Sequence, residues 1–225
     1  MSISTYFDKV FIINLDHRQD KWQSVVSQLK GVGINNYERF SAIKPDISTI
    51  PIVHKENFAA RNNSDGPDET YIVGGMGCKL SHIQVVKMAK ERGYKKTLIF
   101  EDDVVFHHNT NEIFYNAICQ LNNFEPWDML YFTGNHGNRF QKISPNLVKM
   151  FGSHSTVGYG AAASIYDEII NKAYDHPYHI DLFYKEKIHP HFNCYCIMPH
   201  LVWNAPGFSD IEQGYRDYKV LKRHV

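Results

Sequence analysis

Three consecutive carboxylates, Glu101, Asp102 and Asp103, follow directly after an apolar run at residues 98–100. Like charges this close repel one another, and a divalent cation removes that repulsion. Mg²⁺ and Mn²⁺ prefer oxygen ligands and commonly bridge carboxylates to the phosphates of a substrate. The tripeptide therefore indicates a metal site that binds a diphosphate. A solvent-exposed acidic turn is the alternative, and the tripeptide alone leaves it open.

The residues before this acidic stretch predict a buried strand at 96–100. In α/β sheets, ligands bind beyond the carboxyl ends of the strands, so the position suits a functional site. If the alternation of the strand continues for two more residues, Glu101 and Asp103 point to one side and Asp102 points to the other.

Strands and helices alternate along the chain. A short apolar run rich in β-branched residues predicts a buried strand at 10–15. Further strands are predicted at 37–43, 96–100, 128–133, 158–165, which consists mainly of small residues, and 193–198. Apolar residues at helical spacing predict helices at 22–29, at 80–92, at 112–121 and up to residue 173, the last one capped by Ser164 or Asp167. We expect residues 44–71 to form a long, mobile loop and the glycines at 74–77 to form a turn that opens the next helix. The alternation predicts a single α/β domain over residues 1–225.

Charge and composition exclude several classes of protein. The chain has 225 residues, with 24 Lys and Arg against 24 Asp and Glu, so no net charge favours nucleic acid or an anionic membrane. Its four cysteines form neither a disulfide framework nor paired zinc hooks, which favours a reducing compartment. No segment resembles a signal peptide or a membrane span, so we expect the whole chain to be the mature, cytoplasmic protein. Peripheral membrane contact through a lipid-linked acceptor stays open.

Several segments together carry a family resemblance. They are residues 10–16 (VFIINLD), 77–82 (GCKLSH) and 98–104 (LIFEDDV), with weaker similarities at 160–166, 180–181, 199–201 and 209–211. In order and spacing, this set resembles the signature of glycosyltransferase family 25. That family includes bacterial lipooligosaccharide galactosyltransferases and collagen galactosyltransferases.

The resemblance implies a GT-A type fold, in which a Rossmann-like mixed sheet flanked by helices binds a nucleotide sugar. It implies that Asp103, together with Glu101, holds Mn²⁺ or Mg²⁺ on the diphosphate of the donor. The residues that it places at the donor are Asn14, Asp16, Arg18, Ser81, His82, Glu101 and Asp102. The implied reaction moves a hexose, galactose first and glucose second, from a UDP-sugar to a glycan, a lipooligosaccharide or a hydroxylated protein.

Members of this family are inverting enzymes, so one base must take the proton of the acceptor hydroxyl during a single in-line displacement. Asp181 is the predicted base, and Asp210 is the second choice. Each has a plain structural alternative, Asp181 as a helix N-cap and Asp210 as a cap or turn residue. His200 is a further candidate, as a late ligand that completes the metal shell.

Two positions depart from the family pattern. The family often has an acidic residue where this chain has glycine and methionine at 74–76, and Asn204 replaces a usual glutamine. These departures motivate one rival function, a catalytically silent nucleotide-sugar-binding or scaffold module. A second rival is a Mg²⁺-dependent phosphate-handling α/β domain, but residues 133–135 lack the carboxylate that such a domain places after its next strand.

Overall fold

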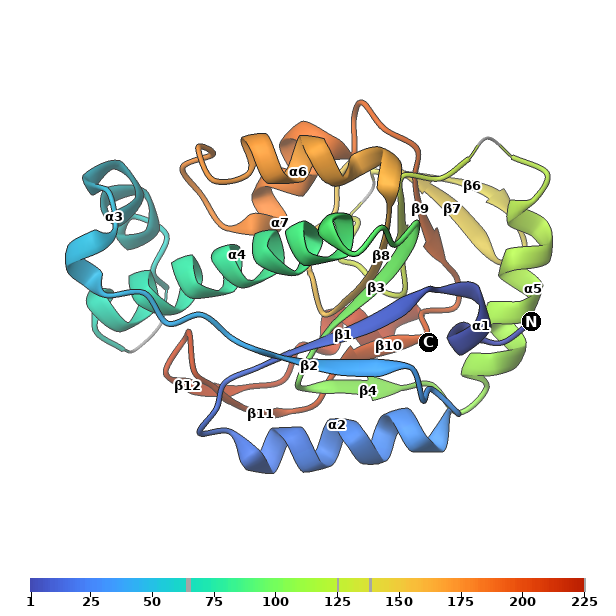
Figure 1. The fold of residues 1–225 in the computed structure, drawn as a ribbon, viewed down its shortest axis with the longest axis horizontal. Coiled ribbons are helices and arrows are strands. Elements are labelled where there is room, and N and C mark those ends of the chain that lie inside the picture. The colour runs from blue at the N-terminus through green and yellow to red at the C-terminus, as the bar shows by residue number, and fades with distance from the viewer. Residues whose placement is uncertain (64–65, 125, 138, 225) are drawn as a thin grey trace.

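A computed structural model describes residues 1–63, 66–124, 126–137 and 139–224, and its centre is an eight-stranded sheet (Figure 1). In sheet order, the strands are β2 (Tyr37–Ser41), β1 (Lys9–Asn14), β3 (Lys96–Glu101), β8 (Gly158–Ala162), β5 (Met129–Tyr131), β9 (Cys194–Ile197), β7 (Leu147–Met150) and β6 (Phe140–Ser144). The strands β2, β1 and β3 are parallel, β8 is antiparallel to both of its neighbours, and β5 and β9 are again parallel. The predicted α/β class with a mixed sheet is confirmed.

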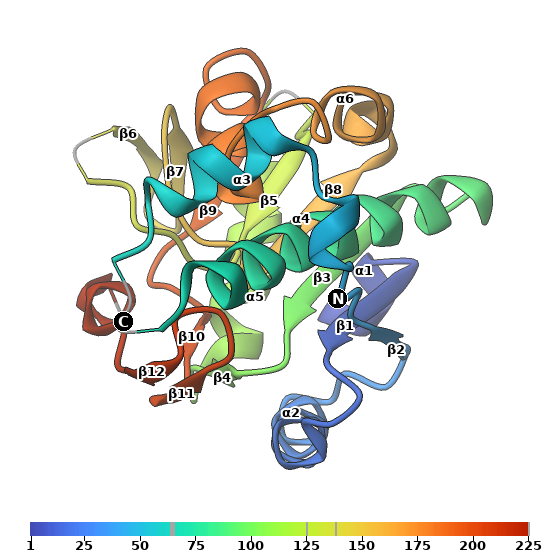
Figure 2. The ribbon, with the colours of Figure 1, turned by 90° about the vertical axis from the view of Figure 1, so that its left-hand side faces the viewer.

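Helices cover both faces of the sheet (Figures 1 and 2). One face packs against α2 (Gln19–Gly31) and α5 (Thr110–Leu121), and the other against α4 (Asp68–Glu91), α6 (Tyr166–Lys172) and α7 (Ile180–Phe183). Neighbouring residues of β1 enter different apolar clusters, Ile12 on one face and Phe11 on the other. This burial on both faces explains why the strand is apolar along its length.

The prediction of a long, mobile loop at residues 44–71 is wrong. This stretch contains a short helical turn, η1 (Ile47–Thr49), then α3 (Ile52–Ala59) and the start of α4. Phe58 of α3 packs with Ile50, Ile72 and Met76 in a small apolar cluster of its own. Helix α3 buries only His54 and Phe58 and leaves Ile52 and Val53 exposed, so its apolar residues do not form the stripe that reveals a helix.

The glycines at 74–77 do not form a turn, because they lie inside α4, and Ser81 and His82 lie in its middle rather than at its start. A Cβ atom on Gly75 would be 2.5 Å from the ring of Phe58, and one on Gly77 would be 2.3 Å from the carbonyl oxygen of Ile43. These glycines therefore allow close packing against α4. A side chain at Gly75 would therefore clash with Phe58.

Two small sheets lie beside the main one. Strand β4 (Val104–Phe106), which follows the acidic stretch, pairs with β10 (Val202–Asn204), and β11 (Gly207–Ser209) forms a hairpin with β12 (Gly214–Arg216). The remaining elements are α1 (Ile3–Tyr6), η2 (Ala163–Ile165), η3 (Tyr184–Ile188) and η4 (Lys219–His224). The predicted cap of α6 is wrong, since the helix has no side-chain cap and the Ser164 hydroxyl donates to Asp128 instead.

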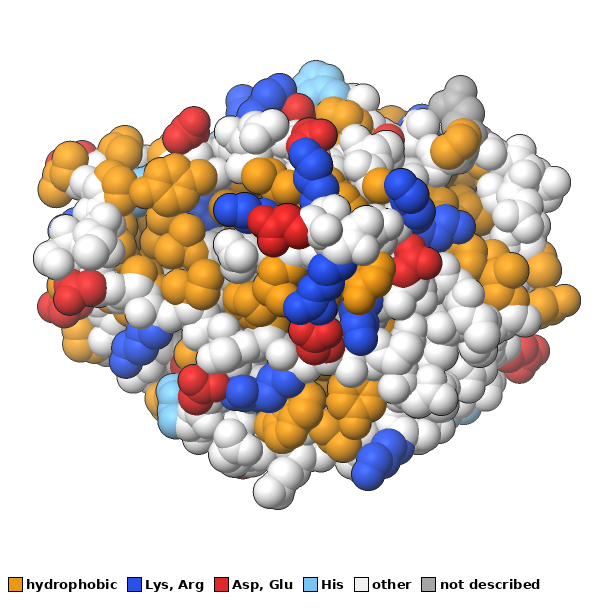
Figure 3. Space-filling model, viewed as in Figure 1, with side chains coloured by type: hydrophobic (Ala, Val, Ile, Leu, Met, Phe, Trp, Pro, Cys, Tyr) orange, Lys and Arg blue, Asp and Glu red, His pale blue; other side chains and the backbone are white. Residues whose placement is uncertain are grey.

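The distribution of charged side chains on the surface and the state of the cysteines agree with what the composition predicts. Basic and acidic side chains are interspersed on the face shown in Figure 3. The four cysteines, Cys78, Cys119, Cys194 and Cys196, are all free thiols. Within the described residues, no helix combines the length and the apolar character needed to cross a membrane.

Candidate active site

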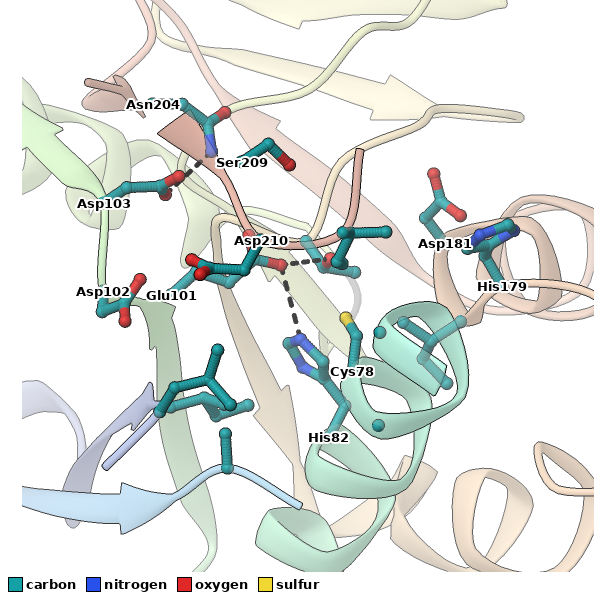
Figure 4. Close-up of a pocket in the computed structure, with 18 of the residues that line it drawn as sticks. Cys78, His82, Glu101, Asp102, Asp103, His179, Asp181, Asn204, Ser209 and Asp210 are labelled. Atoms are coloured by element: carbon teal, nitrogen blue, oxygen red, sulfur yellow. Dashed lines mark hydrogen bonds and ion pairs between the residues drawn. The ribbon is translucent and has the colours of Figure 1, made fainter. Parts of the chain in front are cut away.

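A cavity of about 710 Å³ opens at the carboxyl ends of β1 and β3. Its lining includes these candidate residues: His82, Glu101, Asp102, Asp103, Asp181 and Asp210. Figure 4 shows Asp102 and Asp103 on one side of the cavity and Asp181 on the opposite side. The structure therefore brings together carboxylates that lie far apart in the sequence.

Glu101 is the last residue of β3 and faces α4. Its Oε1 atom accepts a hydrogen bond from Thr156 Oγ1 at 2.7 Å and lies 3.5 Å from His82 Nε2. Desolvation works to raise the pKa of Glu101, but the contacts with His82 and Thr156 outweigh it and hold the pKa below its usual range. Glu101 is therefore ionised at neutral pH.

Asp102 and Asp103 lie in the turn between β3 and β4, so the alternation of the strand does not continue to them. Asp102 Oδ2 accepts from Asn14 Nδ2 at 2.7 Å, and Asp103 Oδ1 accepts from Asn204 Nδ2 at 2.9 Å. Desolvation raises the pKa of both groups, and together with the neighbouring Glu101 charge it brings that of Asp103 to about 7. The exposed acidic turn is thus excluded, because the carboxylates are partly buried and held by specific partners.

Lys21 joins these carboxylates to Asp210. Its Nζ atom lies 3.6 Å from Asp102, 3.9 Å from Asp103 and 3.6 Å from Asp210. The residue lies in the first turn of α2, the helix that follows β1. Sequence reasoning missed Lys21, although a cation placed just after the first strand was a usable signal.

The residues predicted at the end of β1 divide into two groups. Asn14 supports Asp102, and Arg18 makes ion pairs with Asp20 and Asp210, so both lie beside the acidic residues. Asp16 is bound to Arg39 at 2.7 Å and is exposed outside the cavity lining. A donor contact of Asp16 therefore stays a prediction.

Ser81 and His82 have different surroundings although they are neighbours. Ser81 is fully buried; its hydroxyl donates to the carbonyl of Gly77 and accepts from the backbone N–H of Ile43. His82 is also buried, lines the cavity and holds its Nδ1 atom 2.9 Å from the Tyr159 hydroxyl. Ser81 is thus committed to backbone contacts, and its predicted donor contact is untested.

Asp181 lies in the first turn of α7, whose N-cap position belongs to His179, so the capping alternative for Asp181 is wrong. His154 Nδ1 lies 3.5 Å from its carboxylate, and the Lys185 ammonium donates to His154 Nε2 at 2.7 Å. Because an ammonium only donates, the ring proton of His154 sits on Nδ1 and faces Asp181. Desolvation works to raise the pKa of Asp181, but the contact with His154 outweighs it and holds that pKa below its usual range.

Asp210 lies in the turn of the β11–β12 hairpin and is surrounded by cations. Arg18 and Lys21 pair with its carboxylate, and His17 Nε2 lies 3.6 Å away. Its predicted turn position is confirmed. Because Arg18 and Lys21 engage its carboxylate in ion pairs, Asp210 is less available to an acceptor hydroxyl than Asp181.

Metal-ligating groups gather at two places in the described residues. Cys78, His82 and Glu101 bring ligand atoms within 4.8 Å of one another in the cavity wall, and His136, Cys196 and His200 do so in the interior. Glu101 and Asp103 supply the oxygen ligands that suit Mn²⁺ or Mg²⁺. His200 is fully buried outside the cavity lining, so the expectation that it completes the metal shell is wrong.

Sheet, cavity and acidic stretch together define an α/β domain with a mixed sheet, in which the acidic residues lie beyond the carboxyl end of a strand. The chain belongs to glycosyltransferase family 25, described as an LPS biosynthesis protein, since residues 7–181 match that family. The resemblance read from the sequence segments is confirmed.

Relatives and a solved structure show similarity of different kinds. Procollagen galactosyltransferase 1-A of Xenopus laevis is 29% identical over 168 residues, which cover 68% of this chain and 26% of the relative. A protein of Bos taurus named probable inactive glycosyltransferase 25 family member 3 is 24% identical, covering 68% of this chain and 27% of the relative. The chain thus spans about a quarter of the length of these relatives. A glycosyltransferase involved in glycosylation of the major capsid of PBCV-1 is similar with a TM-score of 0.46, 12% identity, and coverage of 91% and 95% of the two chains.

Proposed function

We propose that this chain is a metal-dependent, inverting galactosyltransferase that uses a UDP-sugar donor. The observation that carries the proposal is the partly buried acidic stretch at the cavity, in which the pKa of Asp103 reaches about 7 beside Glu101. Holding carboxylates this close together in a partly buried site costs free energy, and such an arrangement is typical of a cation site. Family membership supports glycosyl transfer and leaves the Mg²⁺-dependent phosphate-handling alternative without support.

Asp103 and Glu101 are the proposed ligands of Mn²⁺ or Mg²⁺. Their oxygen atoms suit a hard divalent ion, and its charge would offset the desolvation and the repulsion from Glu101 that raise the pKa of Asp103. When bound, such an ion neutralises the charge of the diphosphate leaving group. Asn204, which donates to Asp103, fixes the orientation of that carboxylate.

Arg18, Lys21 and Asn14 are the proposed polar groups around the donor on the β1 side. Lys21 Nζ lies within 4 Å of Asp102, Asp103 and Asp210. A small movement of its ammonium group would replace these ion pairs with contacts to phosphate oxygens of the donor. Asn14 donates to Asp102 and holds it on the same side. There the Asp102 carboxylate can accept from a ribose hydroxyl. Arg18 and Lys21 bind the donor, and Asn14, which is buried, positions Asp102.

Asp181 is the proposed base. It is ionised at neutral pH and lines the cavity opposite the acidic stretch (Figure 4), which leaves space for an acceptor hydroxyl between the donor sugar and its carboxylate. The carboxylate takes the proton of that hydroxyl as the new glycosidic bond forms and the UDP leaves. His154 positions Asp181 through the Nδ1 proton.

Galactose is the proposed sugar because the matched relatives carry the name procollagen galactosyltransferase, and glucose is the second choice. The proposed acceptors are a glycan, a lipooligosaccharide or a hydroxylated protein. A cytoplasmic location, with membrane contact only through the acceptor, belongs to the same proposal.

A catalytically silent sugar-nucleotide module is the second candidate. It is favoured by the relative named probable inactive and by the engagement of Asp102 and Asp103 with Lys21 and Asn204. Such a module would bind UDP without turning over any donor.

Release of UDP from UDP-galactose, UDP-glucose and their N-acetyl forms tests the proposal, measured with Mn²⁺ and with a chelator. We expect Mn²⁺-dependent release that is fastest with UDP-galactose and absent in Asp103→Asn. Asp167→Asn is the matched control, because that carboxylate pairs with Lys90 on the surface. UDP binding without release from any donor would favour the silent module.

A further inference from the structure

A second cluster of metal-ligating side chains lies inside the protein, outside the cavity lining. His136 follows β5, Cys196 lies in β9, and His200 precedes β10. Their side chains are 4%, 0% and 0% exposed, and one ligand atom of each lies within 4.8 Å of the others. Three separate segments therefore converge on one buried point.

The orientation of His200 is fixed by the backbone. Its Nδ1 atom lies 2.9 Å from the carbonyl oxygen of Leu221, and because a carbonyl only accepts, Nδ1 carries the proton. The lone pair of a neutral His200 is then on Nε2, which lies 3.4 Å from Nε2 of His136. A ring N–H held by a backbone carbonyl is the usual arrangement of a metal-binding histidine.

The separations suit a small ion. Two imidazole nitrogens bound to one tetrahedral ion at about 2.0–2.1 Å are roughly 3.4 Å apart. The two Nε2 atoms already have this spacing, which is long for a hydrogen bond. The Cys196 sulfur lies within 4.8 Å of a ring nitrogen of each histidine, and a metal–sulfur bond of about 2.3 Å would draw it closer.

We propose that His136, Cys196 and His200 bind a thiophilic d¹⁰ cation, Zn²⁺ or Cu⁺. Imidazole and thiolate together suit these ions and not the hard ions expected at the carboxylates of the cavity. Binding forms two metal–nitrogen bonds and one metal–sulfur bond, and the thiol proton of Cys196 is released to solvent.

The bound ion would connect the core to the active site. His200 lies four residues before Asn204, the last residue of β10, whose side chain donates to Asp103. A cation that ties His200 to β9 and to the segment after β5 therefore fixes the approach to β10. An ion that binds only the folded chain also stabilises it. This site would exist whether or not the chain transfers a sugar.

Cobalt(II) is the probe, because a thiolate bound to cobalt gives a charge-transfer band in the near ultraviolet. The metal-free full chain is titrated with Co²⁺, with Cys78→Ser and Cys194→Ser as matched controls. Cys78 is the other thiol near a histidine, and Cys194 is an equally buried thiol in the same strand as Cys196.

We expect a thiolate band that saturates with one Co²⁺ in the parent and in both controls, in addition to any Co²⁺ that the carboxylates of the cavity bind, and loss of that band in Cys196→Ser and in His136→Gln. Zn²⁺, or Cu⁺ added without oxygen against a coloured chelator, should displace the cobalt and raise the melting temperature of the parent but not of Cys196→Ser. The absence of a thiolate band in the parent would overturn the proposal even if both core variants fail to fold. A band that persists in Cys196→Ser, or disappears in Cys78→Ser, would also overturn it.

Discussion

The two sides of the cavity carry aspartates of similar burial and opposite electrostatics. Desolvation acts to raise the pKa of both groups. At Asp103 the charges of Glu101 and Asp102 add to it and the pKa rises to about 7, whereas at Asp181 the contact with His154 outweighs it and the pKa falls below the usual range. Residue type therefore does not decide the chemistry here; the neighbouring groups do. The Asp103 side is suited to a cation, and the Asp181 side to a free carboxylate that accepts a proton.

Removal of the Asp181 charge is the largest expected effect. Asp181→Asn should lower the transfer rate by about 10²–10⁴-fold, because the amide cannot take the proton of the acceptor hydroxyl. UDP binding should be unchanged, since Asp181 lies opposite the acidic stretch. Steady-state kinetics with calorimetry measures both quantities. Transfer at the parent rate would remove Asp181 as the base.

The pH dependence distinguishes the two sides. Mn²⁺ competes with a proton at Asp103, so below the pKa of about 7 its apparent affinity should fall by up to about tenfold per pH unit. Above that value, the affinity should level off. Titrations with Mn²⁺ from pH 5.5 to about 8.5 test this, and an affinity independent of pH would contradict the assignment of Asp103 as a ligand.

As the pH rises toward 7, the stability of the metal-free chain should fall, whereas its affinity for Mn²⁺ should rise. Because the folded chain binds the Asp103 proton more tightly than the unfolded chain does, stability falls as pH rises from about 4 to about 7. Asp103→Asn removes this cost, so without metal the variant should be more stable than the parent above pH 7, by on the order of 1 kcal/mol. Chemical denaturation at about pH 5 and pH 8 measures the difference, which should be smaller at the lower pH.

Substitution of His154 should have the smallest effect of these variants. His154→Gln should raise the pKa of Asp181, because the contact that holds it low is lost. Measured at saturating Mn²⁺, so that protonation of Asp103 does not limit the rate, the acid limb of the profile of kcat/KM against pH should then move to higher pH, with little change in the plateau. An unmoved limb would mean that His154 does not tune Asp181.

Local sequence patterns were enough to predict most of the sheet and the acidic stretch. Strand β1 is apolar on both faces and β3 ends at a charged residue, so each is visible in a short window. Residues 44–77 were misread because α3 buries few side chains, and because the glycines of α4 serve contacts with Phe58 and Ile43. Such contacts join distant segments and leave no local pattern.

The site was predictable in its carboxylates but not in their partners. Lys21, Thr156 and His154 each act through a contact with a residue at least 27 positions away, which no spacing rule shows. Asn204 was noticed only as a departure from the family pattern, and the structure gives it a role as the donor to Asp103. Resemblance indicated the reacting groups, and the fold was needed to show what sets their charge.

Calorimetry of UDP binding with and without Mn²⁺ tests the central claim most directly, on the parent, Asp103→Asn and the control Asp167→Asn. The account predicts that Mn²⁺ tightens UDP binding at least about tenfold in the parent and in Asp167→Asn, and leaves it unchanged in Asp103→Asn. Equal affinity with and without Mn²⁺ in the parent, or a full Mn²⁺ effect in Asp103→Asn, would contradict it.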